Sequence, residues 1–122
     1  MVKLTRTVSA AVGAVGMVTE LTEQTFGKEV KQHNGVVVVD FWAPWCGPCK
    51  MMGPVFEKLH TELGKKIKFV KVNVDENGKL AEEYGILSIP CVVFLKDGEE
   101  VERVVGFGGE DSLREKVKEF VA

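Results

Sequence analysis

The sequence has only three cysteines and two histidines, too few for the covalent or metal frameworks that stabilise many small proteins. An odd number of cysteines does not fit the paired disulfides of a small secreted domain. A structural zinc ion normally takes four nitrogen or sulfur ligands, and neither His33 nor His60 has a partner at a matching spacing. The sequence therefore predicts no disulfide framework and no metal site.

Three other features are missing, and each absence excludes a class of partner. The formal net charge is −2 at pH 7, so the chain lacks the basic surplus of a nucleic-acid-binding domain. No apolar run reaches the ~20 residues that a membrane-spanning helix needs. No nucleotide, metal or flavin motif occurs, so nothing indicates a bound cofactor. What the chain does have is 45% hydrophobic residues in a length of 122, enough for the core of one domain.

Residues 1–18 differ in composition from the rest of the chain. They include Lys3 and Arg6, have no acidic residue, and contain a weak apolar stretch interrupted by glycine. A secretory signal peptide, an organellar presequence and an extension upstream of a second start at Met17 all fit this composition. We expect a flexible extension that precedes a single domain of residues 19–122, and export or organellar targeting stays open.

From residue 21 the chain alternates between helical periodicity and apolar strands. We expect strands at residues 36–41, 67–74, 91–96 and 100–105, and helices at residues 22–34, at 50–63, between Gly78 and Gly85, and after Gly109. Parallel strands need long connections, so this order predicts helices that cross over a central sheet. The dipeptide Asp97-Gly98 indicates a tight hairpin. The second helix is expected to turn these side chains inward: Met51, Met52, Val55, Phe56 and Leu59.

The stretch with the clearest chemistry contains Cys46 and Cys49, three positions apart, where a predicted strand leads into a predicted helix. Unpaired backbone N–H groups and the positive end of the helix dipole favour a thiolate at that point. A thiolate is the nucleophile in disulfide exchange. The spacing therefore predicts a redox dithiol, in which Cys46 attacks a substrate disulfide and Cys49 resolves the mixed disulfide that results.

Asp40 is the only charged residue in the apolar stretch of residues 36–42. Burial makes a carboxylate costly, so its pKa should be raised. A carboxyl group of that kind exchanges a proton near neutral pH, which suits the activation of Cys49 through a water molecule. The alternative is a carboxylate at the end of the strand that is solvated or paired with Lys71. At this point both interpretations stay open.

Taken together, these residues resemble the thioredoxin family. The resemblance runs from about Val18 to the C-terminus, and its motifs are Trp-Cys-Gly-Pro-Cys at residues 45–49, Val-Asp-Phe-Trp-Ala at residues 39–43 and Ile-Pro at residues 89–90. It implies a three-layer α/β/α sandwich of the α/β class. The central mixed sheet would have four to five strands and would be flanked by four helices.

The same resemblance implies roles for individual residues. Asp40 would be the buried carboxylate that serves the dithiol, Lys71 on the next strand its electrostatic partner, and Pro90 a cis-proline that faces the dithiol. A substrate-binding surface would be formed by Trp45, Gly47, Pro48, Ile89 and Gly106. An extended substrate segment would hydrogen-bond there to the backbone of Ile89.

Cys91 departs from the family pattern, which commonly has a threonine directly after this proline. A free cysteine is most often a small buried hydrophobe, and that is our expectation for Cys91. The alternative is a regulatory thiol, suggested by its position next to Pro90. Labelling the reduced protein with a thiol reagent distinguishes the two.

The resemblance implies a protein-disulfide reductase, a redox protein with oxidoreductase activity whose only redox group is the disulfide formed by Cys46 and Cys49. Its partners would be disulfide-containing proteins and a thioredoxin reductase, and it would be a cytoplasmic monomer. One alternative is an exported oxidoreductase that acts in oxidation or isomerisation, which the reduction potential would reveal. Another is a non-catalytic binding subunit of the same fold, whose function would survive replacement of both cysteines by serine.

Overall fold

The computed structural model describes residues 17–121, and a five-stranded mixed sheet runs through its centre. Within that range the strands, in chain order, are β1 (Thr19–Leu21), β2 (Val36–Trp42), β3 (Lys68–Asn73), β4 (Cys91–Lys96) and β5 (Glu99–Val105). Their spatial order is β1-β3-β2-β4-β5. The first three are parallel to one another, and β4 and β5 are antiparallel to their neighbours.

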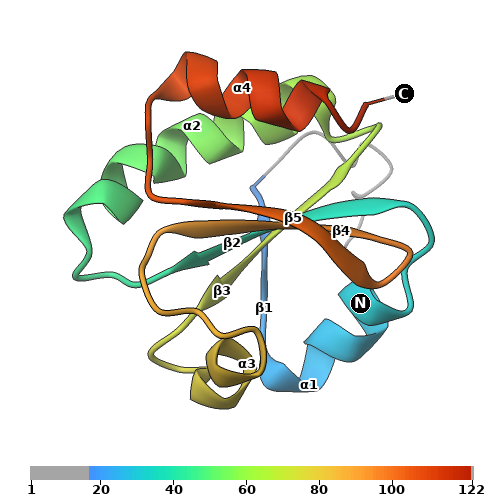
Figure 1. The fold of residues 1–122 in the computed structure, drawn as a ribbon, viewed down its shortest axis with the longest axis vertical. Helices are drawn as coiled ribbons and strands as arrows, with labels where there is room; N and C mark the ends of the chain where they lie inside the picture. Colours follow the sequence, from blue (N-terminus) through green and yellow to red (C-terminus); the bar gives the residue numbers. More distant parts are fainter. Residues whose placement is uncertain (1–16, 122) are drawn as a thin grey trace.

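Helices cover both faces of this sheet. They are α1 (Glu23–Phe26), which continues as the π-helix η2 (Gly27–Lys31), α2 (Gly47–Leu63), α3 (Gly78–Glu83) and α4 (Glu110–Lys118). Figure 1 shows α2 and α4 on one face and α1 and α3 on the other. The three-layer α/β/α prediction is therefore confirmed, with four helical segments over the described residues when α1 and η2 are counted together.

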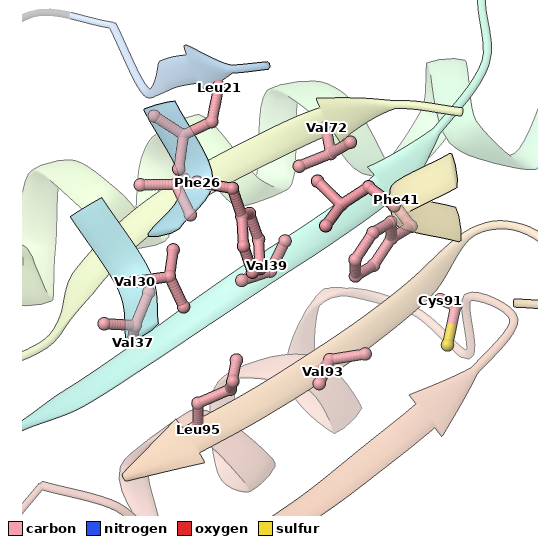
Figure 2. Close-up of a cluster of buried hydrophobic side chains, with 12 residues drawn as sticks. Leu21, Phe26, Val30, Val37, Val39, Phe41, Val72, Cys91, Val93 and Leu95 are labelled. Carbon is pink, nitrogen blue, oxygen red and sulfur yellow. The ribbon is translucent and has the colours of Figure 1, made fainter. Parts of the chain in front are cut away.

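The central strand β2 is buried on both faces, as its apolar sequence predicts. Alternate residues point to opposite faces, so Val37, Val39 and Phe41 lie in one core cluster, drawn in Figure 2. Val38 lies in the other cluster, beneath α2 and α4, with Met52 among its neighbours. Since Asp40 is two residues from Val38, its side chain belongs to the α2 face.

The structure corrects one feature of the predicted face of α2. Met51 was expected to point inward, but 68% of it is exposed. The buried stripe is formed by Cys49, Met52, Phe56 and Leu59, which follow the spacing of three and four residues along one side of a helix. Met51 lies one residue from Met52 and therefore about 100° around the helix axis.

The predicted extension, residues 1–18, lies outside the described residues except for Met17 and Val18. Val18 is buried in the core cluster beneath α2 and α4. Its backbone N–H donates a hydrogen bond to Glu57 Oε1 on α2, at 2.9 Å. The ordered packing of the domain therefore already includes Val18.

Candidate active site

The two cysteines of the motif lie at the first turn of α2 and form a disulfide. Cys46 is the residue that caps the helix, with extended backbone angles (φ −88°, ψ 116°), and its Sγ accepts the backbone N–H of Cys49 at 3.2 Å. In the reduced protein the same N–H, together with the helix dipole, would stabilise a thiolate on Cys46. The geometry therefore suits Cys46 as the attacking sulfur.

Three separate segments meet at the dithiol. Cys46 and Cys49 pack with Ala43 in a small buried cluster that Ile89 partly covers. The carbonyl oxygen of Ile89 lies 3.8 Å from Cys46 Sγ, and the Ile89–Pro90 peptide bond is cis, as the resemblance implies. The Pro90 carbonyl in turn accepts the backbone N–H of Gly106 at 2.8 Å. The loops at Ile89 and Gly106 are thus held against the start of α2.

The residues expected to bind substrate differ in how much of them is exposed. Trp45 is 68% exposed, and its indole Nε1–H donates to Asp75 Oδ2 at 2.8 Å, which fixes the ring beside the dithiol. Gly47 and Pro48 are exposed, and Ile89 and Gly106 are half-buried. Gly106 has φ +87°, a conformation that favours glycine.

Leu87 is an exposed apolar residue that the sequence interpretation did not single out. It lies two positions before Ile89 and is 97% exposed. No periodicity could have identified it, because it lies in the loop between α3 and β4.

Asp40 is buried as predicted, with 3% of the residue exposed. Burial raises its pKa from an ordinary value of 3.8 to about 7, Lys71 opposes that rise, and Glu20 adds to it. Among residues 17–121 nothing hydrogen-bonds to its Oδ1 atom. An unpaired buried carboxyl with this pKa can take up and release a proton near neutral pH.

A cavity of about 290 Å³ connects Asp40 with the second cysteine. Its lining includes Asp40 and Cys49, and it has room for several water molecules. The remaining lining residues are Met17, Trp42, Lys50, Gly53, Pro54, Phe56, Glu57 and Lys71. Asp40 and Cys49 therefore line one solvent-accessible space, in which a water molecule can lie between them.

Lys71 was expected to be the electrostatic partner of Asp40, and in the structure it interacts with both Asp40 and Glu57. Lys71 lies directly opposite Asp40 on the neighbouring strand β3 and lowers the pKa of its carboxyl. Its ammonium nitrogen, however, lies 3.9 Å from Glu57 Oε2 and 5.4 Å from the centre of the Trp42 ring. Glu57 is thus a charged neighbour that sequence reasoning missed. Its spacing of eight residues from Cys49 would have placed it on the same side of α2.

Cys91 lies on the opposite face of the sheet from the dithiol. It is buried in the cluster shown in Figure 2, and burial raises the pKa of its thiol. The residues described here contain no group of three or more His, Cys, Asp or Glu side chains arranged to hold a metal ion. In the same part of the chain, none of the helices combines the length and apolar character needed to span a membrane.

Comparisons with known proteins give the same family over most of the chain. A family model described as thioredoxin matches residues 17–119. The thioredoxin of Bacillus subtilis is 51% identical over 104 residues, which is 85% of this chain and 98% of that protein. The thioredoxin of Listeria monocytogenes is 43% identical over 105 residues, covering 86% of this chain and all of that protein.

Solved structures give the same result. The crystal structure of Malassezia sympodialis thioredoxin superposes with a TM-score of 0.79 at 43% identity, over 88% of this chain and 93% of that one. The structure of a mutant thioredoxin from Halobacterium salinarum superposes with a TM-score of 0.78 at 39% identity, over 87% and 92% of the two chains.

Proposed function

The chain belongs to the thioredoxin family, and from that premise we propose how its residues divide the work of disulfide reduction. It is a redox protein with protein-disulfide reductase activity, which resides in the Cys46/Cys49 dithiol. The described structure holds the oxidised state, in which the two sulfurs are bonded. The reaction begins from the reduced state.

In the first step the thiolate of Cys46 attacks a substrate disulfide. A mixed disulfide forms between Cys46 and the substrate, and one substrate sulfur leaves as a thiolate. The N–H of Cys49, which contacts Cys46 Sγ at 3.2 Å, stabilises the attacking charge. Trp45, Gly47, Pro48, Ile89 and Gly106 form the surface on which an extended substrate segment docks.

In the second step Cys49 loses its proton and attacks Cys46 Sγ. The new bond is the disulfide of the oxidised protein, and the second substrate sulfur leaves as a thiolate that is then protonated. Asp40 takes the Cys49 proton through water in the shared cavity. The observation that carries this assignment is that Asp40, buried and with a pKa of about 7, lines the same cavity as Cys49.

The oxidised protein must regain two electrons, and we propose that a thioredoxin reductase supplies them. We place the protein in the cytoplasm, a compartment in which enzymatic reducing systems keep protein thiols reduced. We propose that it works as a monomer, since each copy carries both cysteines and Asp40.

The experiment is the reduction of a disulfide-bonded test protein, with a thioredoxin reductase or dithiothreitol as electron source. Cys49→Ser should accumulate the mixed disulfide, because Cys46 still attacks and nothing resolves the product. Asp40→Asn should slow the second step by about 10²-fold, the usual contribution of a positioned acid–base group, and leave the first step nearly unchanged. If Asp40→Asn kept both the rate and the pH dependence of the second step, the proton role of Asp40 would be refuted.

A further inference from the structure

Two carboxyl groups lie near Lys71, that of Asp40 on the neighbouring strand and that of Glu57 on α2. In the described residues, the ammonium group of Lys71 forms its ion pair with Glu57. Lys71 is the in-register partner of Asp40, so both side chains lie on the α2 face of the sheet. Nevertheless its Nζ lies 3.9 Å from Glu57 Oε2 and over the Trp42 ring. Over the described chain, Asp40 Oδ1 stays without a hydrogen-bond partner.

Glu57 is itself fixed by a second contact. While Oε2 faces Lys71, Oε1 accepts the backbone N–H of Val18 at 2.9 Å. Val18 is buried beneath α2, so this acceptor position is anchored in the core. Because both oxygens are engaged, the Glu57 carboxylate is held in one orientation, and that orientation faces Lys71.

A lysine that paired directly with Asp40 would favour the charged form of the carboxyl group and lower its pKa. Burial raises the pKa of Asp40 to about 7 even though Lys71 opposes it, which shows that the opposition is incomplete. The ionisable groups near Asp40 are Cys49, Lys50 and Glu57 on α2, Lys71 on β3 and Glu20 on β1, while Cys91 of β4 lies on the other face of the sheet. Only Glu57 among them forms an ion pair with Lys71 in the described residues.

We propose that Glu57 is a positioning residue, which holds Lys71 away from Asp40 and so keeps the buried carboxyl group able to exchange a proton with Cys49. This inference rests on the proposed proton role of Asp40. It assigns Glu57 no contact with substrate and no step of its own. The role is carried by three contacts: Val18 to Glu57, Glu57 to Lys71, and Lys71 over Trp42.

The test is the substitution Glu57→Gln in the reduced protein. Glutamine keeps an oxygen that can accept the Val18 N–H, but it removes the charge that attracts Lys71. Lys71 should then turn toward Asp40 and lower the pKa of its carboxyl by about 1 pH unit. Carbon-13 NMR titration of the Asp40 carboxyl group measures this directly, and the pH at which the mixed disulfide resolves should move in the same direction.

Two further variants separate this role from a general effect of charge. Glu62→Gln makes the same change on α2, at a carboxylate that pairs with Arg114 at 2.9 Å, and it should leave the Asp40 titration unchanged. In a Lys71→Met background, Glu57→Gln should also have no effect, because the lysine that it positions is gone. An equal shift with and without Lys71 would mean that Glu57 acts by its own charge, and would overturn the proposal.

The NMR titration also keeps this inference distinct from the proposed function. If Asp40→Asn left the second step unchanged, the catalytic role of Asp40 would fail, while the Asp40 pKa could still respond to Glu57. If Asp40→Asn slowed the second step but Glu57→Gln left the Asp40 titration unchanged, Glu57 would not position Lys71. Each result therefore rejects one of the two statements and leaves the other to its own measurement.

Discussion

The two faces of β2 use the same strand for different purposes. One face presents Val37, Val39 and Phe41 to a buried apolar cluster (Figure 2). The other presents Val38 and then Asp40, which lies beneath α2 and lines the cavity beside Cys49. Residues that are neighbours in sequence thus differ completely in surroundings, because successive side chains of a strand point to opposite faces.

The two faces contribute differently to the free energy of folding. The apolar face stabilises the fold, and the buried Asp40 on the α2 face destabilises it. Filling the first face with valine, leucine and phenylalanine yields burial energy with no unpaired polar group. Placing Asp40 in the second face sacrifices stability whenever its carboxyl is ionised. In the proposed mechanism, that costly group lies where the reaction needs a proton acceptor. Changes on the two faces should therefore have opposite effects on stability and activity.

The largest expected effect is the loss of reduction in Cys46→Ser, on the α2 side. The serine hydroxyl is not a nucleophile toward disulfides at neutral pH, so turnover of a disulfide-bonded test protein should fall to the uncatalysed level. The far-UV circular dichroism spectrum should stay native, because Cys46 contributes little to either large core cluster. If folded Cys46→Ser still formed a mixed disulfide through Cys49, the attacking sulfur would be that of Cys49 and not that of Cys46.

On the apolar face, Phe41→Ala should reduce stability and leave the chemistry intact. Phe41 is fully buried against Tyr84, and truncation of such a ring costs about 3–5 kcal/mol in free energy of unfolding. Urea denaturation of the oxidised protein measures the loss. Val101→Ala on the exposed side of β5 is the matched control and should cost less than about 1 kcal/mol. A large drop in the reduction rate of folded Phe41→Ala would show that the faces are not independent.

The neighbouring change Asp40→Asn should have the opposite sign and depend on pH. The native pKa of about 7 exceeds the unfolded value near 3.8, so the contribution of Asp40 to stability is greatest below pH 4 and is lost as pH rises toward 7. An asparagine side chain cannot ionise, so the variant should be more stable by roughly 4 kcal/mol above pH 7 and nearly equal below pH 4.

Urea denaturation across pH 4–8 provides the measurement for Asp40→Asn. Asp111→Asn makes the same chemical change at a fully exposed side chain on α4, and it should leave the pH dependence as in wild type. Parallel pH curves for wild type and Asp40→Asn would show that Asp40 ionises as easily in the folded protein as in the unfolded one. The contrast between the two faces of β2 would then disappear.

Much of the secondary structure could be predicted from the sequence because the signals are local. The run of valines in β2, the limits of β4 and the end of α2 before Gly64 follow from hydrophobic pattern and from glycine alone. The hairpin at Asp97-Gly98 is confirmed, with φ values of +52° and +87° at the two residues. Met51 was misplaced because it lies about 100° around the helix axis from Met52, outside the buried stripe of α2.

The α2 face was predicted less completely because its geometry depends on packing between distant segments. The residue types of Cys46, Cys49 and Asp40 indicate their chemistry, so the sequence alone singled them out as candidates. The cis bond at Pro90 was expected from the resemblance, since no local pattern specifies it. The contact between Glu57 and Lys71 requires α2 to lie over β3, and the contact of Glu57 with Val18 requires β1 to begin beneath α2. No spacing rule contains those two facts.

The smallest expected effect is at Cys91. It is next to the candidate active-site residue Pro90 in sequence, but its side chain lies on the apolar face of the sheet. There it belongs to the same cluster as Val93 and Leu95, across the sheet from the dithiol. With 1% of the residue exposed and a pKa raised chiefly by burial, its thiol should resist a thiol reagent at neutral pH in the native reduced protein.

Mass spectrometry after labelling should therefore find the reagent on Cys46 and none on Cys91, until urea exposes all three thiols. Cys91→Val, a swap between small apolar side chains, should change the free energy of unfolding by less than about 1.5 kcal/mol and leave the reduction rate unchanged. Rapid labelling of native Cys91 would mean that the β4 end of the apolar face opens to solvent. In that case Cys91 would be a candidate regulatory thiol because of its position next to Pro90. The face of the sheet on which a side chain lies would then not separate structural residues from functional ones.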